Sequence, residues 1–179
     1  MLGRGTQFTT IRVPATAAGP ELVLRPWVAE DAAALVDVYR DPAIRHWIRV
    51  AVRDVDQAAA WVAAQQEGWR TGERLCFAVL DGTELVACVV LKKPRTRPEV
   101  GYWTAAAARG RGVASRAVDA LSTWAFATFR ATRLELRHQV DNLASCRVAQ
   151  KTGFDLHSTI LAAAPYPLDG HLHVRHAPA

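Results

Sequence analysis

Arginine and glycine alternate in one short segment, Arg109-Gly110-Arg111-Gly112-Val113-Ala114, which directly precedes a long helical pattern. Free N–H groups at the N-terminus of a helix attract anions, and glycine lets the backbone approach phosphate oxygens closely. The two arginine side chains would add positive charge. The segment therefore predicts a binding site for a diphosphate group. The alternative is a tight connection between a strand and a helix that binds nothing.

The spacing of these glycines excludes two common phosphate-binding loops. A nucleotide P-loop ends in G-K-[ST], and the segment contains no lysine. A dinucleotide-binding turn reads G-x-G-x-x-G, and serine stands at position 115 where its third glycine would be. Any anion site here belongs to another kind of fold.

Histidines provide a second group of candidates. His171 and His173 flank one leucine, and such a pair can bind a metal. Two histidines without a third ligand make a weak metal motif, so we expect no metal site. His138 has an intrinsic pKa suited to acid–base work, and His157 has no partner that the sequence identifies.

The three cysteines, Cys76, Cys88 and Cys146, are an odd number and show no C-x-x-C spacing. This pattern argues against a disulfide framework or a zinc site and is typical of the reducing cytoplasm. Each cysteine stands among apolar residues, so we expect small buried side chains rather than nucleophiles.

The composition is that of a globular protein, with 50% hydrophobic and 22% charged residues in a chain of 179. The net charge of +5 favours an anionic ligand or partner but does not by itself indicate nucleic acid, and we expect no nucleic-acid binding. No apolar run reaches the ~18 residues of a membrane span. We therefore expect a cytoplasmic protein, monomeric or homodimeric.

Periodic patterns predict the elements that must position these residues. Helical spacing occurs at residues 30–40, 42–47, 54–70, 113–129 and 143–151. Strand patterns occur at residues 21–25, 76–80, 84–91, 100–103, 133–137, 154–161 and 172–174, with a hairpin turn at 81–82. The order predicts an α/β fold with a mixed sheet. Residues 1–20 read as a partly disordered leader, and residues 21–176 as a single domain.

Two motifs give the chain its family resemblance. Arg109 to Ala114 meets the signature R/Q-x-x-G-x-G/A, and Asn142 to Phe154 meets N-x-x-S followed by K-x-G-F. Together with Gly101-Tyr102-Trp103, they resemble the GNAT (GCN5-related N-acetyltransferase) superfamily. More narrowly, they resemble the RimJ/RimL-like branch, which acetylates the N-terminal α-amino groups of ribosomal proteins.

The resemblance implies an acetyl-CoA-dependent N-acetyltransferase. Its fold would be a mostly antiparallel mixed sheet, splayed between two parallel strands and flanked by helices on both faces. The implied cofactor-binding residues are Trp103, Thr104, Arg109, Gly110, Arg111, Gly112, Val113, Ala114, Ser115, Asn142, Ser145 and Lys151. For Lys151 the alternative is that it only caps its helix.

The resemblance also implies direct attack of a neutral amine on the acetyl carbonyl, with no covalent enzyme intermediate. Ser145 would protonate the leaving thiolate, or else only bond to its own helix. Glu99 would act as base through water, or else be a solvated carboxylate at a strand edge. His138 is a weaker candidate for the base.

Tryptophans mark the expected acceptor side. Trp47, Trp61 and Trp69 would line an apolar or peptide-accepting groove, or else pack in the core. The acceptor would be a protein N-terminal α-amine or a small-molecule amine. The alternatives are an enzyme that acetylates an antibiotic in self-protection and an acyl-CoA-binding module without turnover. A short last strand, at 172–174, would leave the cleft open.

Overall fold

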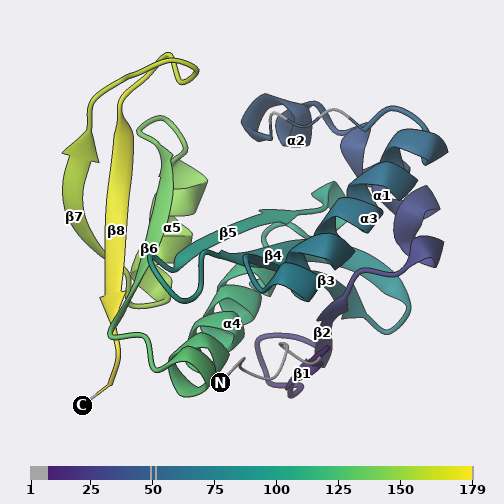
Figure 1. Cartoon of the computed structure of the whole chain (residues 1–179), viewed down its shortest axis with the longest axis horizontal. Coiled ribbons are helices and arrows are strands. Elements are labelled where there is room, and N and C mark those ends of the chain that lie inside the picture. Colours follow the sequence, from purple (N-terminus) through teal and green to yellow (C-terminus); the bar gives the residue numbers. More distant parts are fainter. Residues whose placement is uncertain (1–7, 49, 51, 179) are drawn as a thin grey trace.

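An eight-stranded sheet forms the centre of the molecule (Figure 1). The computed structural model describes residues 8–48, 50 and 52–178. The strands lie in the order β1-β2-β3-β4-β5-β6-β8-β7, and every neighbouring pair is antiparallel except β5 and β6. Their bounds are β1 Ile11–Val13, β2 Leu22–Pro26, β3 Arg74–Asp81, β4 Glu84–Lys92, β5 Glu99–Thr104, β6 Arg133–Gln139, β7 Asp155–Ile160 and β8 Gly170–His176.

Helices cover both faces of this sheet (Figure 1). One apolar core lies under α1 to α3, and a second, larger core lies under α4 and α5. Burial of apolar side chains on both faces is the main favourable contribution to folding. The helices are η1 Ala29–Asp31, α1 Ala32–Tyr39, α2 Pro42–Trp47, α3 Val55–Thr71, η2 Ala106–Ala108, α4 Val113–Phe129 and α5 Leu143–Lys151.

Side-chain caps fix where three helices begin. Asp41 accepts a hydrogen bond from Ala43 N at 2.9 Å and starts α2, whose first residue is a proline. Asp54 caps α3 by accepting from Gln57 N at 2.8 Å. Asn142 caps α5 by accepting from Ser145 N.

The parallel strands β5 and β6 pair only briefly. Their register comprises two residue pairs, Glu99 with Glu135 and Val100 with Leu136. Beyond them β5 continues to Thr104 and β6 to Gln139 without further pairing between the two strands. The sheet is therefore splayed at this point, as the family resemblance implied, and the fold class predicted above is confirmed.

The structure adds a strand at one end of the domain and lengthens the last one. Within the expected leader, Ile11–Val13 pairs with β2 as an additional edge strand; residues 1–7 lie outside the described part. The last strand is not short. It spans seven residues, Gly170–His176, and pairs along all of β6. No helix among the described residues is long and apolar enough to cross a membrane.

Candidate active site

The glycine-rich turn adopts the backbone conformation that an anion site needs. Gly110 and Gly112 have φ values of 75° and 74°, in the left-handed region that glycine adopts without strain. Gly112 is the N-cap of α4 and contributes no side-chain cap. The first N–H to bond within the helix is that of Arg116, to Gly112 O at 3.1 Å. The N–H groups of Val113, Ala114 and Ser115 precede it and can point at an anion.

The two arginines of the turn are already ion-paired. Arg109 pairs with Asp41, the residue that caps α2, and Arg111 pairs with Asp81 at 2.8 Å. Both guanidiniums are about 40% exposed, so the pairs are partly screened by solvent. These contacts fix the turn to the α1–α2 connection and to the β3–β4 hairpin. The anion site therefore depends on backbone N–H groups more than on free arginine charge.

The splay between β5 and β6 leaves one side of β5 unpaired from Gly101 to Thr104. Trp103 and Thr104 lie on this stretch, where the resemblance places cofactor contacts. The Trp103 side chain itself is buried in the core under α1 to α3 and packs edge-on against Tyr39, with ring centroids 6.4 Å apart. Only the backbone of Trp103 can serve a ligand in the gap.

Ser145 faces this gap and has a partner that the sequence did not identify. The hydroxyl of Tyr102, on β5, donates a hydrogen bond to Ser145 Oγ at 3.0 Å. Burial raises the pKa of Tyr102 to about 12, although the Ser145 contact lowers it. Because Ser145 Oγ accepts this bond, its own proton is available to another acceptor. Alternation along β5 could have placed Tyr102 opposite Trp103, but no pattern indicates its contact with α5.

Asn142 and Lys151 lie at opposite ends of α5. Asn142 Oδ1 accepts from Ser145 N at 3.1 Å, which fixes the first turn that carries Ser145. Its amide NH₂ remains a potential donor to a ligand. Lys151 is exposed in the last turn of the helix, roughly 12 Å along the axis from Leu143. This position fits the alternative in which Lys151 interacts with the helix C-terminus.

Charged side chains surround the paired end of β5 and β6. Lys92 Nζ contacts Glu99 Oε1 at 2.5 Å, and Arg137 Nε lies 3.8 Å from Glu99 Oε2. Both carboxylate oxygens of Glu99 therefore face cations. Alternation also places Glu99 and Tyr102 on opposite faces of β5. The geometry gives no support to Glu99 as the base.

The buried neighbour Glu135 takes part in three ion pairs, with Arg97 at 3.0 Å, Arg133 at 2.7 Å and Arg137 at 2.6 Å. Burial alone would raise the pKa of this carboxyl. The ion pairs, led by Arg137, outweigh burial and lower it. This cluster holds together the strands at the point from which they diverge.

The structure separates the three tryptophans proposed for the acceptor side. Trp69 is 1% exposed, packs on Phe77 and Trp124 in the core under α4, and donates to Cys76 O at 2.8 Å. It lines no open groove. Trp61 packs edge-on against Trp27, with centroids 4.9 Å apart. Trp47, at the end of α2, is 37% exposed and is the one of the three that solvent reaches readily.

A cavity of about 420 Å³ lies beside α1 and the connection from α2 to α3. Its lining combines apolar side chains, among them Val36 and Tyr39, with the arginines Arg40, Arg45 and Arg53. Tyr39 joins this cavity to the end of β5 through its contact with Trp103. The cavity therefore has a cationic, partly apolar wall near the splay.

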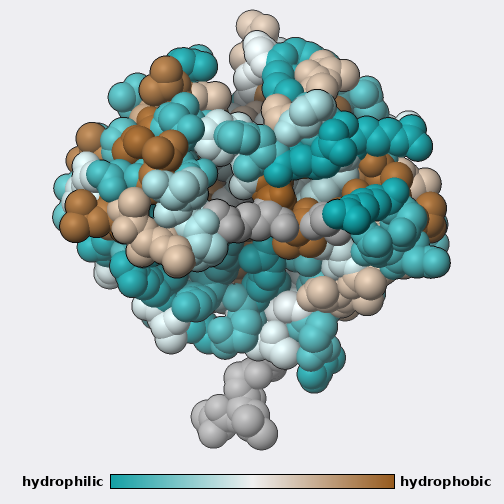
Figure 2. Space-filling model, turned by 90° about the horizontal axis from the view of Figure 1, so that it is seen from above, coloured by the Kyte–Doolittle hydropathy of each residue, from teal (hydrophilic) through white to brown (hydrophobic). Residues whose placement is uncertain are grey.

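The last hairpin borders the other side of the molecule. Figure 2 shows apolar side chains, in brown, gathered over this hairpin, which lies at the left in Figures 1 and 2. Ile160, Leu161 and Leu168 are among the exposed large hydrophobic residues here.

Cys76 and Cys88 are buried, as expected, with their Sγ atoms 3.3 Å apart. Cys146 is only partly buried and lies beside histidines of this hairpin.

Comparisons with known proteins agree with this geometry. Residues 21–155 match the family described as acetyltransferase (GNAT) domain. A search of curated proteins found no match. Among solved structures, the microcin C7 self-immunity acetyltransferase MccE, in complex with acetyl-CoA and AMP, has 16% identity and a TM-score of 0.81 over 89% of this chain and 94% of that chain.

Two further solved structures are similar in fold. Mycobacterium smegmatis RimJ, in complex with CoA-disulfide, has 21% identity and a TM-score of 0.79 over 95% of this chain and 87% of that chain. A ribosomal-protein-serine acetyltransferase homologue from Vibrio cholerae has 21% identity and a TM-score of 0.80 over 97% and 100%. The family match spans three quarters of the sequence, and the fold agrees with it. The chain belongs to the acetyltransferase (GNAT) family.

Proposed function

We propose that this protein transfers the acetyl group of acetyl-CoA to a primary amine of an acceptor that carries acidic groups, most simply a protein N-terminal α-amine. One observation carries the proposal. The Tyr102–Ser145 pair lies on the unpaired stretch of β5, and the glycine turn at the start of α4 follows the end of that stretch in the chain. An elongated ligand with a diphosphate at one end and a reactive group at the other fits this arrangement.

The chain's own groups have distinct tasks in this reaction. The N–H groups that open α4 bind the diphosphate, and the left-handed glycines keep side chains out of its path. The unpaired edge of β5 offers backbone donors and acceptors to the pantetheine arm. Acetyl-CoA supplies the activated acetyl group. The protein's part in the chemistry is to orient that group and to provide a proton to the departing sulfur.

Ser145 is the proton donor in this proposal. Its oxygen accepts from Tyr102, so its own hydrogen can be donated toward the gap, and Tyr102 can replace it along the same bond. The high pKa of Tyr102 keeps the phenol protonated at physiological pH. The amine must arrive neutral.

The arginine-lined cavity favours an acidic acceptor over a polycationic one. Arg45 and Arg53 are exposed on its wall, and Arg40 also pairs with Asp37 at 2.9 Å. Positive charge at a binding wall attracts carboxylates and repels amines that are already multiply charged. An aminoglycoside-type antibiotic is therefore disfavoured as acceptor. A peptide with one α-amine followed by Asp or Glu residues suits the wall.

A thiol-release assay tests this function. Wild-type protein with acetyl-CoA is supplied with two peptides that share an N-terminal residue but continue with acidic or with basic residues. Faster CoA release with the acidic peptide supports the proposal. Binding of acetyl-CoA without release by any amine would instead favour a non-catalytic acyl-CoA-binding module. Thermal unfolding with acetyl-CoA, and with ATP as the control nucleotide, establishes binding separately.

A further inference from the structure

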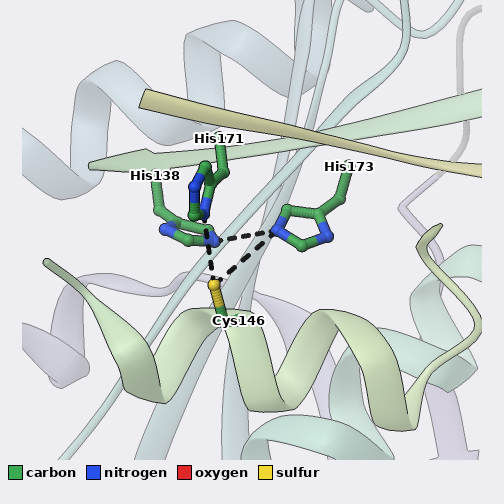
Figure 3. Close-up of side chains that lie close together, drawn as sticks. All are labelled: His138, Cys146, His171 and His173. Atoms are coloured by element: carbon green, nitrogen blue, oxygen red, sulfur yellow. Dashed lines mark hydrogen bonds between the residues drawn. The ribbon is translucent and has the colours of Figure 1, made fainter. Parts of the chain in front are cut away.

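Four metal-ligating side chains meet between α5 and the β6–β8 pair, outside the catalytic roles proposed above (Figure 3). They are His138 of β6, Cys146 of α5, and His171 and His173 of β8. One ligand atom from each lies within 4.8 Å of the other three. The sequence offered no third ligand for the His171–His173 pair; the fold provides two.

The backbone determines which ring nitrogen of two histidines bears the proton. His138 Nδ1 lies 2.7 Å from Gln139 O, and His173 Nδ1 lies 3.3 Å from Phe154 O. A carbonyl oxygen only accepts hydrogen bonds, so each Nδ1 must be the donor. In a neutral imidazole the other nitrogen, Nε2, then carries a bare lone pair. Hydrogen bonds of this kind from the outer nitrogen are typical of metal-ligating histidines.

These two lone pairs point at each other. His138 Nε2 and His173 Nε2 are 3.1 Å apart, and His173 is buried. Such a contact is repulsive unless an electrophile lies between the two nitrogens. A proton would satisfy only these two atoms. A cation shared with the neighbouring thiol and third imidazole would satisfy all four groups.

The remaining distances complete the same centre. Cys146 Sγ lies 3.3 Å from His171 Nδ1 and 3.9 Å from His173 Nε2. In a tetrahedral zinc site, bond lengths of about 2.0–2.1 Å to nitrogen and about 2.3 Å to sulfur place the ligand atoms about 3.3–3.6 Å apart. Three of the six ligand-atom separations, 3.1 to 3.9 Å, bracket that range, and all six are within 4.8 Å, so side-chain adjustments of about 1 Å suffice.

We propose that His138, Cys146, His171 and His173 form a tetrahedral site for Zn²⁺. One thiolate and three imidazoles match the borderline-soft character of this ion. Four protein ligands leave no open position, so the site is structural and does not activate water. Zinc here would join α5 to β6 and β8. Because Ser145 directly precedes Cys146, the site would also fix the serine in position at the gap.

The experiment uses the full chain, purified without a histidine tag. Wild-type protein is expected to retain about one Zn²⁺ per chain after desalting. After chelation, added Co²⁺ should give the intense d–d absorption of tetrahedral cobalt and a thiolate-to-cobalt charge-transfer band. Cys146→Ser should abolish the charge-transfer band and weaken Co²⁺ binding by about 100-fold or more, since even outer-shell changes cost 10–100-fold. His157→Gln, at an exposed histidine of β7, is the matched control and should bind as the wild type does.

Thiol labelling tests the site without any variant. Zn²⁺ should protect Cys146 of the wild-type chain from alkylation, read by mass spectrometry, whereas Cys76 and Cys88 are buried with or without metal. The proposal is overturned if Co²⁺ gives no charge-transfer band and Cys146 is alkylated equally fast with and without Zn²⁺. In that case the His138–His173 pair shares a proton. Both readouts are independent of acetyl transfer.

Discussion

The phenol of Tyr102 donates a 3.0 Å hydrogen bond to Ser145 Oγ, and this bond joins β5 to α5 across the splayed edge of the sheet. The two residues are 43 positions apart in the sequence. One is on the strand whose free edge faces the gap, and the other is in the first turn of the helix that follows β6. The bond provides a proton path that ends at the serine.

Ser145→Ala tests the end of this path. We predict that kcat falls by about 10²-fold or more, the range of general acid catalysis, while the Kd for acetyl-CoA stays within about twofold. Steady-state turnover assays measure kcat, and calorimetric titration measures the Kd for acetyl-CoA. Ser158→Ala, at an exposed serine of β7, is the matched control. Undiminished kcat in Ser145→Ala would remove the serine from the mechanism.

Tyr102→Phe tests the second member of the pair. We predict a smaller loss of kcat, about tenfold, because Ser145 retains its own proton. The pKa of Tyr102 is about 12, so the phenol keeps its proton well above neutral pH. The pH profiles of wild type and Tyr102→Phe should therefore share the same alkaline limb up to about pH 10. If the activity of the wild type falls below pH 10 and that of Tyr102→Phe does not, Tyr102 loses its proton at a lower pH than its burial implies.

Gly112→Ala tests the anion turn. At φ 74° a Cβ costs about 1–2 kcal/mol of stability, and relief of this strain would disturb the N–H groups that open α4. We predict at least about a tenfold rise in the Kd for acetyl-CoA. Gly82→Ala is the control, because Gly82 has a φ of 59° in the β3–β4 hairpin, with open space around its Cβ position. Gly82→Ala should lose a similar free energy of unfolding but keep the wild-type affinity for acetyl-CoA.

Glu135→Gln tests the charged cluster at the paired end of β5 and β6. The folded-state pKa of Glu135 is lowered, so the unfolded chain binds its proton more readily. Its stabilising effect is therefore complete above the ordinary pKa of 4.5 and is lost as pH falls through the folded value. We predict a loss of about 1–2 kcal/mol at pH 7, since the arginines are partly exposed.

Urea unfolding at pH 7 and at pH 4 measures the difference in free energy of unfolding between wild type and Glu135→Gln. This difference should be smaller at pH 4. Glu67→Gln provides the comparison, because Glu67 forms an exposed ion pair with Arg70 on α3. Its removal should leave unfolding nearly unchanged at both pH values. A gap between wild type and Glu135→Gln that is the same at pH 4 as at pH 7 would mean that packing, not charge, is responsible.

Arg45→Glu together with Arg53→Glu tests the acceptor wall. We predict that KM for an acidic peptide rises by about tenfold, with a weaker dependence on salt, and that KM for acetyl-CoA is unchanged. Arg12→Glu on the edge strand β1 together with Arg95→Glu in the loop between β4 and β5 changes the net charge by the same amount and is the control. Equal KM values for the acidic peptide in the double variant and in the wild type would show that the cavity does not select the acceptor.

Local periodicity predicted most of the fold, because amphipathic helices and alternating strands reflect the face that each element buries. Strand β1 was not predicted, because three residues that lie among glycines and prolines show no recognisable periodicity. Trp61 and Trp69 were expected to line one groove or to pack in the core, but eight residues at 100° each leave about 80° between them on α3. That rotation sends Trp61 toward Trp27 and Trp69 toward Phe77.

The glycine turn and Ser145 were identified from motifs, yet their partners were not. The Asp41–Arg109 pair, the Tyr102–Ser145 bond and the meeting of His138 with Cys146 all join segments distant in sequence. Contacts of this kind are set by strand order and helix docking, which no local sequence pattern reveals. The histidine cluster could have been suspected only by aligning β6 with β8, where His138 is opposite His171.

The brief pairing of β5 with β6 divides the sheet into two blocks. One contains β1 to β5 and the other contains β6, β8 and β7, and the direct contact between their strands is two residue pairs wide. Cooperative units separated by so narrow a contact open independently more readily than a continuous sheet does. Hydrogen exchange should therefore resolve two opening free energies in the ligand-free protein. A ligand that bridges the gap would merge them into one, so that cofactor binding makes the domain unfold as a single unit.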